Sequence, residues 1–293
     1  MSDLSRLSLN TATTKHLTLA EAIEVSVKHG LGAIGPWRDR VQEVGAETAG
    51  RMIADAGLRC SMLCRGGFMT GRDSAQVERA LADNRLAIDE CVALGTAELC
   101  LVVGGLPAAY GLLGLPQTDS DADDKDLVAA RQRMADRVGD LVPYAIERGV
   151  RLALEPMNPL FTADRGVLTT IGQSLDVAAD HPASAVGVVV DTYHVWWDPD
   201  LQASIARAGA EGRISSYQVC DWSLPLQPNT LNSRGFMGDG FIDFPTISGW
   251  VRDTGYVGDV EVEIFNEQIW AMPGDEIVGT MGQRYAELVL PHL

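Results

Sequence analysis

The sequence predicts an α/β fold, a single (β/α)8 barrel over residues 1–293 with its active site at the C-terminal ends of the strands. Short apolar runs of strand length alternate about eight times with longer helix-like segments. A chain of 293 residues is long for an ordinary domain but usual for one barrel with a continuous core. The segments after the strands are long and rich in Gly, Pro, Trp and Arg, which is typical of barrels that build a site there.

The predicted strands are buried apolar runs at residues 6–10, 31–34, 58–63, 97–103, 150–155, 186–191, 214–219 and 260–265. Helices are predicted between them, at residues 19–29, 45–56, 74–94, 126–148, 171–180, 199–208, 245–254 and 275–290. Several helices precede a glycine that would end them just before the next strand, as at Gly30, Gly57, Gly149 and Gly255.

The segments that follow the strands lie at residues 35–38, 65–69, 104–124 and 221–243. In the last of these, Gly238-Asp239-Gly240 predicts a tight turn that shapes the loop. A phosphate-binding loop is a poorer interpretation, because the aspartate would repel an anion.

The net charge of −17 and the pI near 4.6 argue against nucleic acid as a ligand, since such binding begins with basic side chains that replace counterions on phosphates. No apolar stretch reaches the roughly 18 to 20 residues that cross a bilayer, and the first residues lack the basic and then apolar start of a signal peptide. The sequence therefore predicts a cytoplasmic protein without a membrane partner.

Four predicted strands carry an oxygen ligand at or near the C-terminal end, namely Glu155, Asp191, Gln218 and Glu263. Charged side chains are rarely left unpaired in buried strands, and the ends of parallel barrel strands meet on one face. We therefore expect the four side chains to surround one divalent cation, Mn²⁺ or Mg²⁺ before Co²⁺ or Zn²⁺. The alternative is that each residue only begins a loop, which the repetition on four strands disfavours.

Five short segments resemble the xylose isomerase-like TIM barrel superfamily, which includes sugar-phosphate isomerases and epimerases, inosose dehydratases and isomerases, and dehydroshikimate dehydratases. They are residues 154–158, 190–194, 217–221, 234–240 and 261–263. The resemblance implies that Glu155, Asp191, Gln218 and Glu263 hold the cation. It further implies that His194 lies beside the cation in contact with substrate and that Arg234 binds a substrate oxygen.

At one position the sequence departs from the pattern of the ketose epimerases in this superfamily. Many ketose epimerases have histidine where this chain has Gln218, and glutamine there resembles the dehydroshikimate-dehydratase and inosose-type branches.

The implied function is a metal-dependent isomerase, epimerase or dehydratase acting on a small carbohydrate, keto-polyol or cyclic polyol. Glu155 and Glu263 are the expected acid and base next to a polarised carbonyl, and His194 is expected to assist them. Trp37 and Phe68, in loops after the second and third strands, are expected to stack on a sugar face.

Two other functions stay open at the level of sequence. One is the catalytic subunit of a C-glycoside deglycosidase complex, which would need a partner protein. The other is a barrel that binds a ligand without catalysis. A homo-oligomer is also expected, from apolar residues near Trp270 and Met272 that we expect to be exposed.

Overall fold

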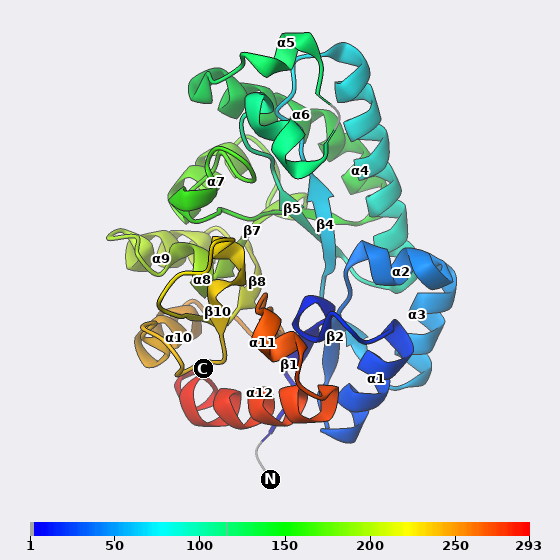
Figure 1. Cartoon of the computed structure of the whole chain (residues 1–293), viewed down its shortest axis with the longest axis vertical. Helices are drawn as coiled ribbons and strands as arrows, with labels where there is room; N and C mark the ends of the chain where they lie inside the picture. Colours follow the sequence, from blue (N-terminus) through cyan, green and yellow to red (C-terminus); the bar gives the residue numbers. More distant parts are fainter. Residues whose placement is uncertain (1–2, 116) are drawn as a thin grey trace.

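The computed structural model describes residues 3–115 and 117–293 and forms a barrel of parallel strands surrounded by helices (Figure 1). The order of strands around the sheet is β3-β2-β1-β11-β8-β7-β6-β5-β4. The first and last strands along the chain, β1 and β11, are neighbours and pair in parallel. The strands are β1 (Leu7–Asn10), β2 (Ala33–Gly35), β3 (Arg59–Cys60), β4 (Leu63–Gly67), β5 (Glu98–Val102), β6 (Arg151–Leu154), β7 (Val186–Asp191), β8 (Ile214–Gln218) and β11 (Val260–Val262). The predicted barrel is thereby confirmed.

The eight predicted helices are all present and cover the outside of the barrel (Figure 1). They are α1 (Leu19–Lys28), α3 (Ala46–Asp55), α4 (Ser74–Leu94), α6 (Leu127–Arg148), α7 (Ile171–Ala178), α9 (Leu201–Ala210), α10 (Phe244–Asp253) and α12 (Gly274–Leu288). The four glycines expected to follow helices all have positive φ, as at Gly149 with φ 68°, where a side chain would be strained.

Shorter helices occupy the loops. They are α2 (Arg38–Val44), α5 (Asp119–Ala122), α8 (Thr192–Val195) and α11 (Glu267–Trp270), together with 3₁₀ turns at η1 (Thr11–Thr14), η2 (Pro107–Leu113), η3 (Pro159–Phe161), η4 (Thr230–Ser233) and η5 (Leu290–His292). The sequence pattern did not predict α2, because a helix of seven residues is too short to show a clear periodicity.

The third strand differs from the prediction of residues 58–63. The structure divides this region into β3, which pairs with β2, and β4, which pairs with β5 as far as Gly67. Glycine has low strand propensity, so the apolar pattern ended before Gly66 and Gly67 although their backbone lies in the sheet. A parallel bridge between Trp37 and Cys64 closes the barrel at this point.

Alternation along the strands determines which side chains face into the barrel. In β6, Leu152 and Leu154 pack in the main core between strands and helices, whereas Ala153 belongs to a separate small cluster with Met62, Cys64, Cys100 and Val189. Glu155 follows Ala153 by two residues and therefore faces the same way. The same spacing relates Asp191 to Val189 on β7.

A short antiparallel pair, β9 (Asp221–Trp222) and β10 (Arg234–Gly235), lies in the loop after β8. The carboxylate of Asp221 accepts hydrogen bonds from the backbone N–H groups of Gly238, Gly240 and Ile242 at 2.9, 2.8 and 3.0 Å. The structure thus confirms the predicted tight turn at residues 238–240, and the turn holds β10 and its Arg234 in place.

Two expectations about the surface have different outcomes. None of the helices in residues 3–115 and 117–293 combines the length and apolarity that a bilayer crossing requires. The expected exposed apolar patch is wrong, since Met272 packs against the core and the Trp270 indole N–H donates to the carbonyl of Ala12 at 2.7 Å. These residues therefore do not provide the surface on which a homo-oligomer was expected.

Candidate metal and substrate site

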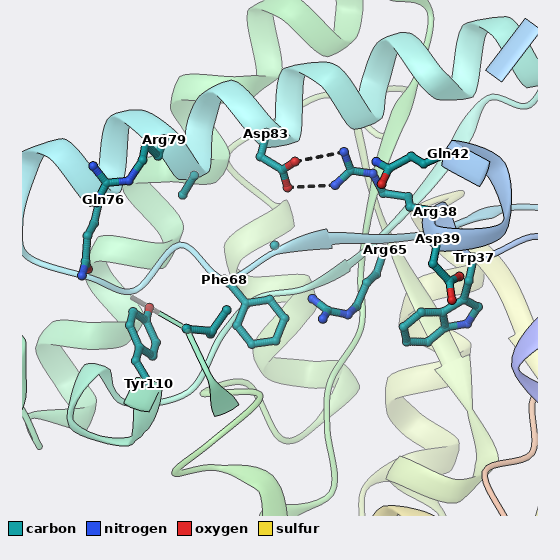
Figure 2. Close-up of a pocket in the computed structure, with 13 residues that line it drawn as sticks. Trp37, Arg38, Asp39, Gln42, Arg65, Phe68, Gln76, Arg79, Asp83 and Tyr110 are labelled. Atoms are coloured by element: carbon teal, nitrogen blue, oxygen red, sulfur yellow. Dashed lines mark hydrogen bonds and ion pairs between the residues drawn. The ribbon is translucent and has the colours of Figure 1, made fainter. Parts of the chain in front are cut away.

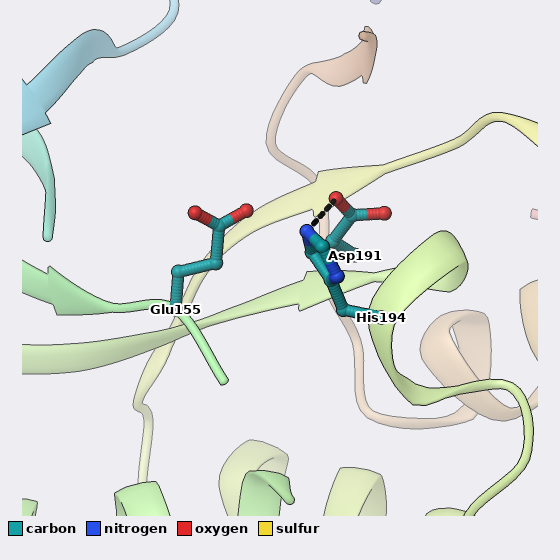
Figure 3. A group of neighbouring side chains, drawn as sticks. All are labelled: Glu155, Asp191 and His194. Atoms are coloured by element: carbon teal, nitrogen blue, oxygen red, sulfur yellow. Dashed lines mark ion pairs between the residues drawn. The ribbon is translucent and has the colours of Figure 1, made fainter. Parts of the chain in front are cut away.

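Glu155, Asp191 and His194 converge at the C-terminal ends of β6 and β7. One potential ligand atom from each lies within 4.8 Å of the others, and all three side chains are buried (Figure 3). Asp191 ends β7 and caps the short α8 by accepting a hydrogen bond from the Tyr193 N–H at 2.8 Å. The α8 turn places His194 beside Asp191, with 3.7 Å between His194 Nε2 and Asp191 Oδ2.

Arg234 joins Glu263 to this cluster. Its Nη1 lies 3.1 Å from Asp191 Oδ2 and 3.0 Å from Glu263 Oε2, and it also donates to the backbone carbonyl of Glu263 at 3.1 Å. The guanidinium is buried between the rings of Tyr193 and Phe265, at 4.6 and 5.2 Å from their centroids. The structure therefore brings Glu155, Asp191, His194, Arg234 and Glu263 together, as the sequence predicted.

Burial raises the pKa of all three carboxyl groups. The pKa of Glu155 is well above its ordinary value because burial and the nearby charges of Glu263 and Asp191 disfavour ionisation. Burial also raises the pKa values of Asp191 and Glu263, although the adjacent Arg234 guanidinium opposes this effect. An upward shift of the pKa is typical of carboxyl groups that serve in acid–base chemistry.

Both ring nitrogens of His194 lie next to hydrogen-bond donors. The backbone N–H of Asn158 is 3.1 Å from Nδ1, and Arg234 Nη2 is 2.9 Å from Nε2. A neutral imidazole accepts at only one of its two nitrogens, so one of these contacts is not a hydrogen bond. Burial and the charge of Arg234 lower the pKa of His194 well below its ordinary value, which keeps the ring neutral. Because both nitrogens already face donors of the protein, His194 is better suited to contact substrate than to act as a cation ligand.

Gln218 lies next to Asp191 in the sheet register and is almost fully buried. Its Nε2 donates to Glu261 Oε1 at 3.1 Å, while its Oε1 has no hydrogen-bond partner among the described residues. A buried amide oxygen without a donor costs free energy unless something else binds it. This orphaned oxygen, beside a carboxylate, fits a cation ligand.

The charges of the cluster also fit a divalent cation. Glu155, Asp191 and Glu263 would contribute three negative charges when ionised, and Arg234 contributes one positive charge. The balance is two negative charges in a buried site, which a divalent ion would compensate. Oxygen donors of this kind are typical of Mg²⁺ and Mn²⁺ sites, and Zn²⁺ is also compatible with them.

A cavity of about 260 Å³ opens above these residues and is lined by Glu155, Glu263, His194 and Arg234. Trp37 and Phe68 line it as well, as expected of residues that could stack on a sugar. Trp37 has a second role that the sequence did not suggest, because its indole N–H donates to Glu263 Oε1 at 3.1 Å and orients that carboxylate.

Three residues near the cavity were absent from the sequence prediction. Arg65 and Arg165 line the cavity, and Glu261 is buried below it, where it accepts hydrogen bonds from Asn10 and Ser61 at 2.7 and 2.6 Å. Glu261 lies two residues before Glu263, so both side chains point to the same side of the sheet. This spacing could have identified Glu261 from the sequence. Arg65 lies within a predicted loop segment and only the structure shows its direction.

Comparison with known proteins places these features in a family. An L-ribulose 3-epimerase of Methylomonas sp. is 26% identical over 202 residues, which cover 69% of this chain and 61% of that protein. The chain thus spans about three fifths of this relative. A ketose 3-epimerase of Arthrobacter globiformis is 25% identical over 244 residues, covering 82% of this chain and 75% of the relative.

Solved structures cover the chain more completely. A Sinorhizobium meliloti protein has a TM-score of 0.89 and 40% identity, covering 98% of this chain and 99% of its own. The IolI protein, solved with a zinc atom, has a TM-score of 0.80 at 19% identity, with coverages of 98% and 99%, and this likeness concerns the fold alone.

A family profile described as the xylose isomerase-like TIM barrel matches residues 20–283, which is most of the chain. The match takes in Glu155, Asp191, Gln218 and Glu263. It confirms the resemblance inferred from the five short segments, and this protein belongs to the xylose isomerase-like TIM barrel family.

Proposed function

We propose that this protein is a divalent-metal-dependent epimerase or isomerase that moves a proton at the carbon next to the carbonyl of a keto-sugar. The observation that carries the proposal is the pair of buried carboxyl groups, Glu155 and Glu263, that line one cavity and have raised pKa values. Sequence relatives named as ketose and L-ribulose 3-epimerases support the substrate class.

Epimerisation needs one group to remove a proton and another to return it from the opposite face. Glu155 follows β6 and Glu263 follows β11, so the two carboxyl groups enter the cavity from different parts of the barrel wall. Each is anchored by a donor on one side. The Cys100 thiol contacts Glu155 Oε2 at 3.4 Å, and the Trp37 indole N–H holds Glu263 Oε1. These contacts orient the carboxyl groups before substrate binds.

His194 and Arg234 are suited to bind a substrate oxygen. His194 Nε2 lies 2.9 Å from Arg234 Nη2, and in the tautomer that carries its proton on Nε2 both groups are donors. An oxygen that accepts from both would relieve the repulsion. The ketone or hydroxyl oxygen next to the reacting carbon is such an acceptor.

A divalent cation held by Glu155, Asp191, Gln218 and Glu263 would polarise the carbonyl and stabilise negative charge on its oxygen. The residues contribute the rest. Arg234 offsets part of the charge of the carboxylates, and the apolar rings of Tyr193 and Phe265 around it exclude water from that side of the site.

Gln218 favours a second candidate outcome, loss of a β-hydroxyl from the same proton-abstraction step. A glutamine in this position resembles the dehydratase branch of the superfamily, and a solved structure named as a probable 3-DHS dehydratase from Bacillus anthracis shares the fold with a TM-score of 0.70 at 17% identity. The two outcomes share their first step and differ in their products.

The proposal is tested by incubating the protein with Mn²⁺ and a panel of ketoses in D₂O and following the sugars by NMR. We expect deuterium to enter at the carbon next to the carbonyl, together with formation of the epimer. Glu155→Gln and Glu263→Gln should each lower the rate by about a thousandfold or more, because each removes a group that transfers the proton.

Glu24→Gln, the same change at an exposed position of α1, is the matched control and should retain the wild-type rate. Circular dichroism of all variants establishes that the fold is intact. Near-full activity of both Glu155→Gln and Glu263→Gln would refute the mechanism. Formation of a dehydrated product without an epimer would select the dehydratase.

A further inference from the structure

Arg65 is a cation inside the active-site opening that the proposed chemistry does not use. It lies in β4, and its guanidinium is held between two aromatic rings, 4.3 Å from the centroid of Phe68 and 5.7 Å from that of Trp37 (Figure 2). The side chain is partly buried. The two rings fix its direction, so the guanidinium is presented to the cavity in a defined position.

Arg65 has no acceptor within the described part of the chain. All other arginines there that are partly or fully buried make an ion pair or a hydrogen bond, for example Arg38 with Asp83 at 2.8 Å and Arg151 with Glu98 at 2.6 Å. For Arg65 the structure records contacts only with ring faces, and burial lowers its pKa. Cation–π contacts leave the five N–H donors of a guanidinium without acceptors.

Arg65 lies where two cavities meet. The inner cavity of about 260 Å³ contains Glu155 and Glu263, and an outer cavity of about 630 Å³ extends along α4. Trp37, Arg65, Phe68 and Leu115 line both cavities. A substrate whose carbonyl is at the inner site and whose chain extends outward would therefore pass the guanidinium.

We propose that the substrate carries an oxyanion, a carboxylate or a phosphate, on the part remote from its carbonyl, and that Arg65 binds this group. The inference rests on the proposed function for the position of the carbonyl, and it narrows the substrate class from keto-sugars to acidic keto-sugars. A guanidinium matches carboxylate and phosphate oxygens with two parallel hydrogen bonds, which a neutral hydroxyl does not provide.

The negative net charge of the protein makes Arg65 more important for binding an anionic substrate. With a net charge of −17 the protein repels anions at long range. An unpaired cation within the opening compensates for that repulsion locally. Arg38, which also lines the outer cavity, is neutralised by Asp83 and Glu90, so it does not serve the same purpose.

The test uses three ligands that differ only at C6, namely D-fructose, D-fructuronate and D-fructose 6-phosphate. Affinities are measured by thermal shift for the wild type, Arg65→Met and Arg65→Lys, each with Mn²⁺ and with EDTA. Methionine keeps an unbranched stem between the rings and removes the charge. Arg79→Met, at an exposed position that lines the outer cavity, is the matched control.

We expect the wild type to bind at least one acidic ligand about tenfold or more tightly than D-fructose. Arg65→Met should bind the three ligands with equal affinity, so that the preference is lost. Arg65→Lys should retain part of the preference, and Arg79→Met should retain it fully. The ligand with the larger preference identifies carboxylate or phosphate as the natural group.

The two proposals fail in different ways. An oxyanion preference that depends on Arg65 and persists in EDTA supports this inference even if Mn²⁺ has no effect and no sugar is epimerised. Equal responses of the wild type to the three ligands, including no response to any, would overturn it. A preference that survives in Arg65→Met would overturn it as well. The two results that would overturn the role of Arg65 leave the proposed epimerisation of neutral ketoses untouched.

Discussion

At the scale of single residues, the candidate site balances carboxylates against one guanidinium. Arg234 compensates part of the charge of Asp191 and Glu263, and it is buried with them. The sequence predicted that these residues converge but assigned Arg234 only to a substrate oxygen. Its second role depends on distances across the barrel, because Asp191 ends β7, Arg234 lies in β10 and Glu263 follows β11.

Glu261 provides a residue-scale prediction about pH. Burial is the largest cause that raises its pKa from 4.5 to about 7, although Ser61 and Asn10 donate hydrogen bonds to it. The folded protein therefore holds a proton that the unfolded chain releases above pH 4.5. This contribution to stability is fully present below pH 4.5 and is lost as the pH rises through 7, in total on the order of 3 kcal/mol.

We expect Glu261→Gln to remove this part of the pH dependence. The free energy of unfolding is measured by urea denaturation of the metal-free protein at about pH 5 and about pH 8. The loss of stability between these conditions should be smaller in Glu261→Gln than in the wild type by about 3 kcal/mol. The same loss in both proteins would contradict the expectation.

At the scale of elements, the end of β4 depends on a helix. The side chain of Asn84, on α4, accepts from the Gly67 N–H at 2.7 Å and donates to the Gly67 carbonyl at 3.0 Å. These bonds hold the strand end that carries Arg65. They also explain why the sequence pattern placed the strand end too early, since a side chain distant in sequence stabilises the strand at Gly67.

Asn84→Ala should lower the free energy of unfolding by about 2 kcal/mol, because it leaves the buried N–H and carbonyl of Gly67 without this partner. Asn84→Asp keeps the acceptor but sets a buried carboxylate oxygen against the Gly67 carbonyl, so its effect should be at least as large. Urea denaturation measures both. Gln132→Ala, which removes an exposed amide on α6, is the control with an expected change within about 0.5 kcal/mol, and an equally small change in Asn84→Ala would disprove the role of Asn84.

At the scale of the whole molecule, the barrel holds charges that a cation would neutralise. Mn²⁺ should therefore stabilise the folded protein by mass action, by about 2.7 kcal/mol at one hundred times the dissociation constant. For a chain of this length the melting temperature should rise by about 5 °C or more. Differential scanning calorimetry with Mn²⁺ and with EDTA measures the rise.

Asp191→Asn should lose most of this stabilisation, because it removes one charged ligand of the proposed site. Glu24→Gln, on the surface, should keep it. An identical melting temperature of the wild type in Mn²⁺ and in EDTA would refute the cation site, whatever the activity of the protein.

The sequence by itself determined the barrel and the carboxylates of the site. Both follow from local pattern, since period-two alternation and strand-end position fix which side chains face inward. The convergence of Glu155, Asp191 and Glu263 could therefore be predicted from the order of the residues alone.

Tertiary structure alone decided how these groups interact. The surroundings of His194 depend on the Asn158 backbone and on Arg234, and the orientation of Gln218 depends on Glu261. That Arg65 finds no acceptor in residues 3–115 and 117–293 depends on which groups lie near it. Such relations join residues that are far apart in the chain, and a linear pattern carries no information about their distances or about which charges remain without a partner.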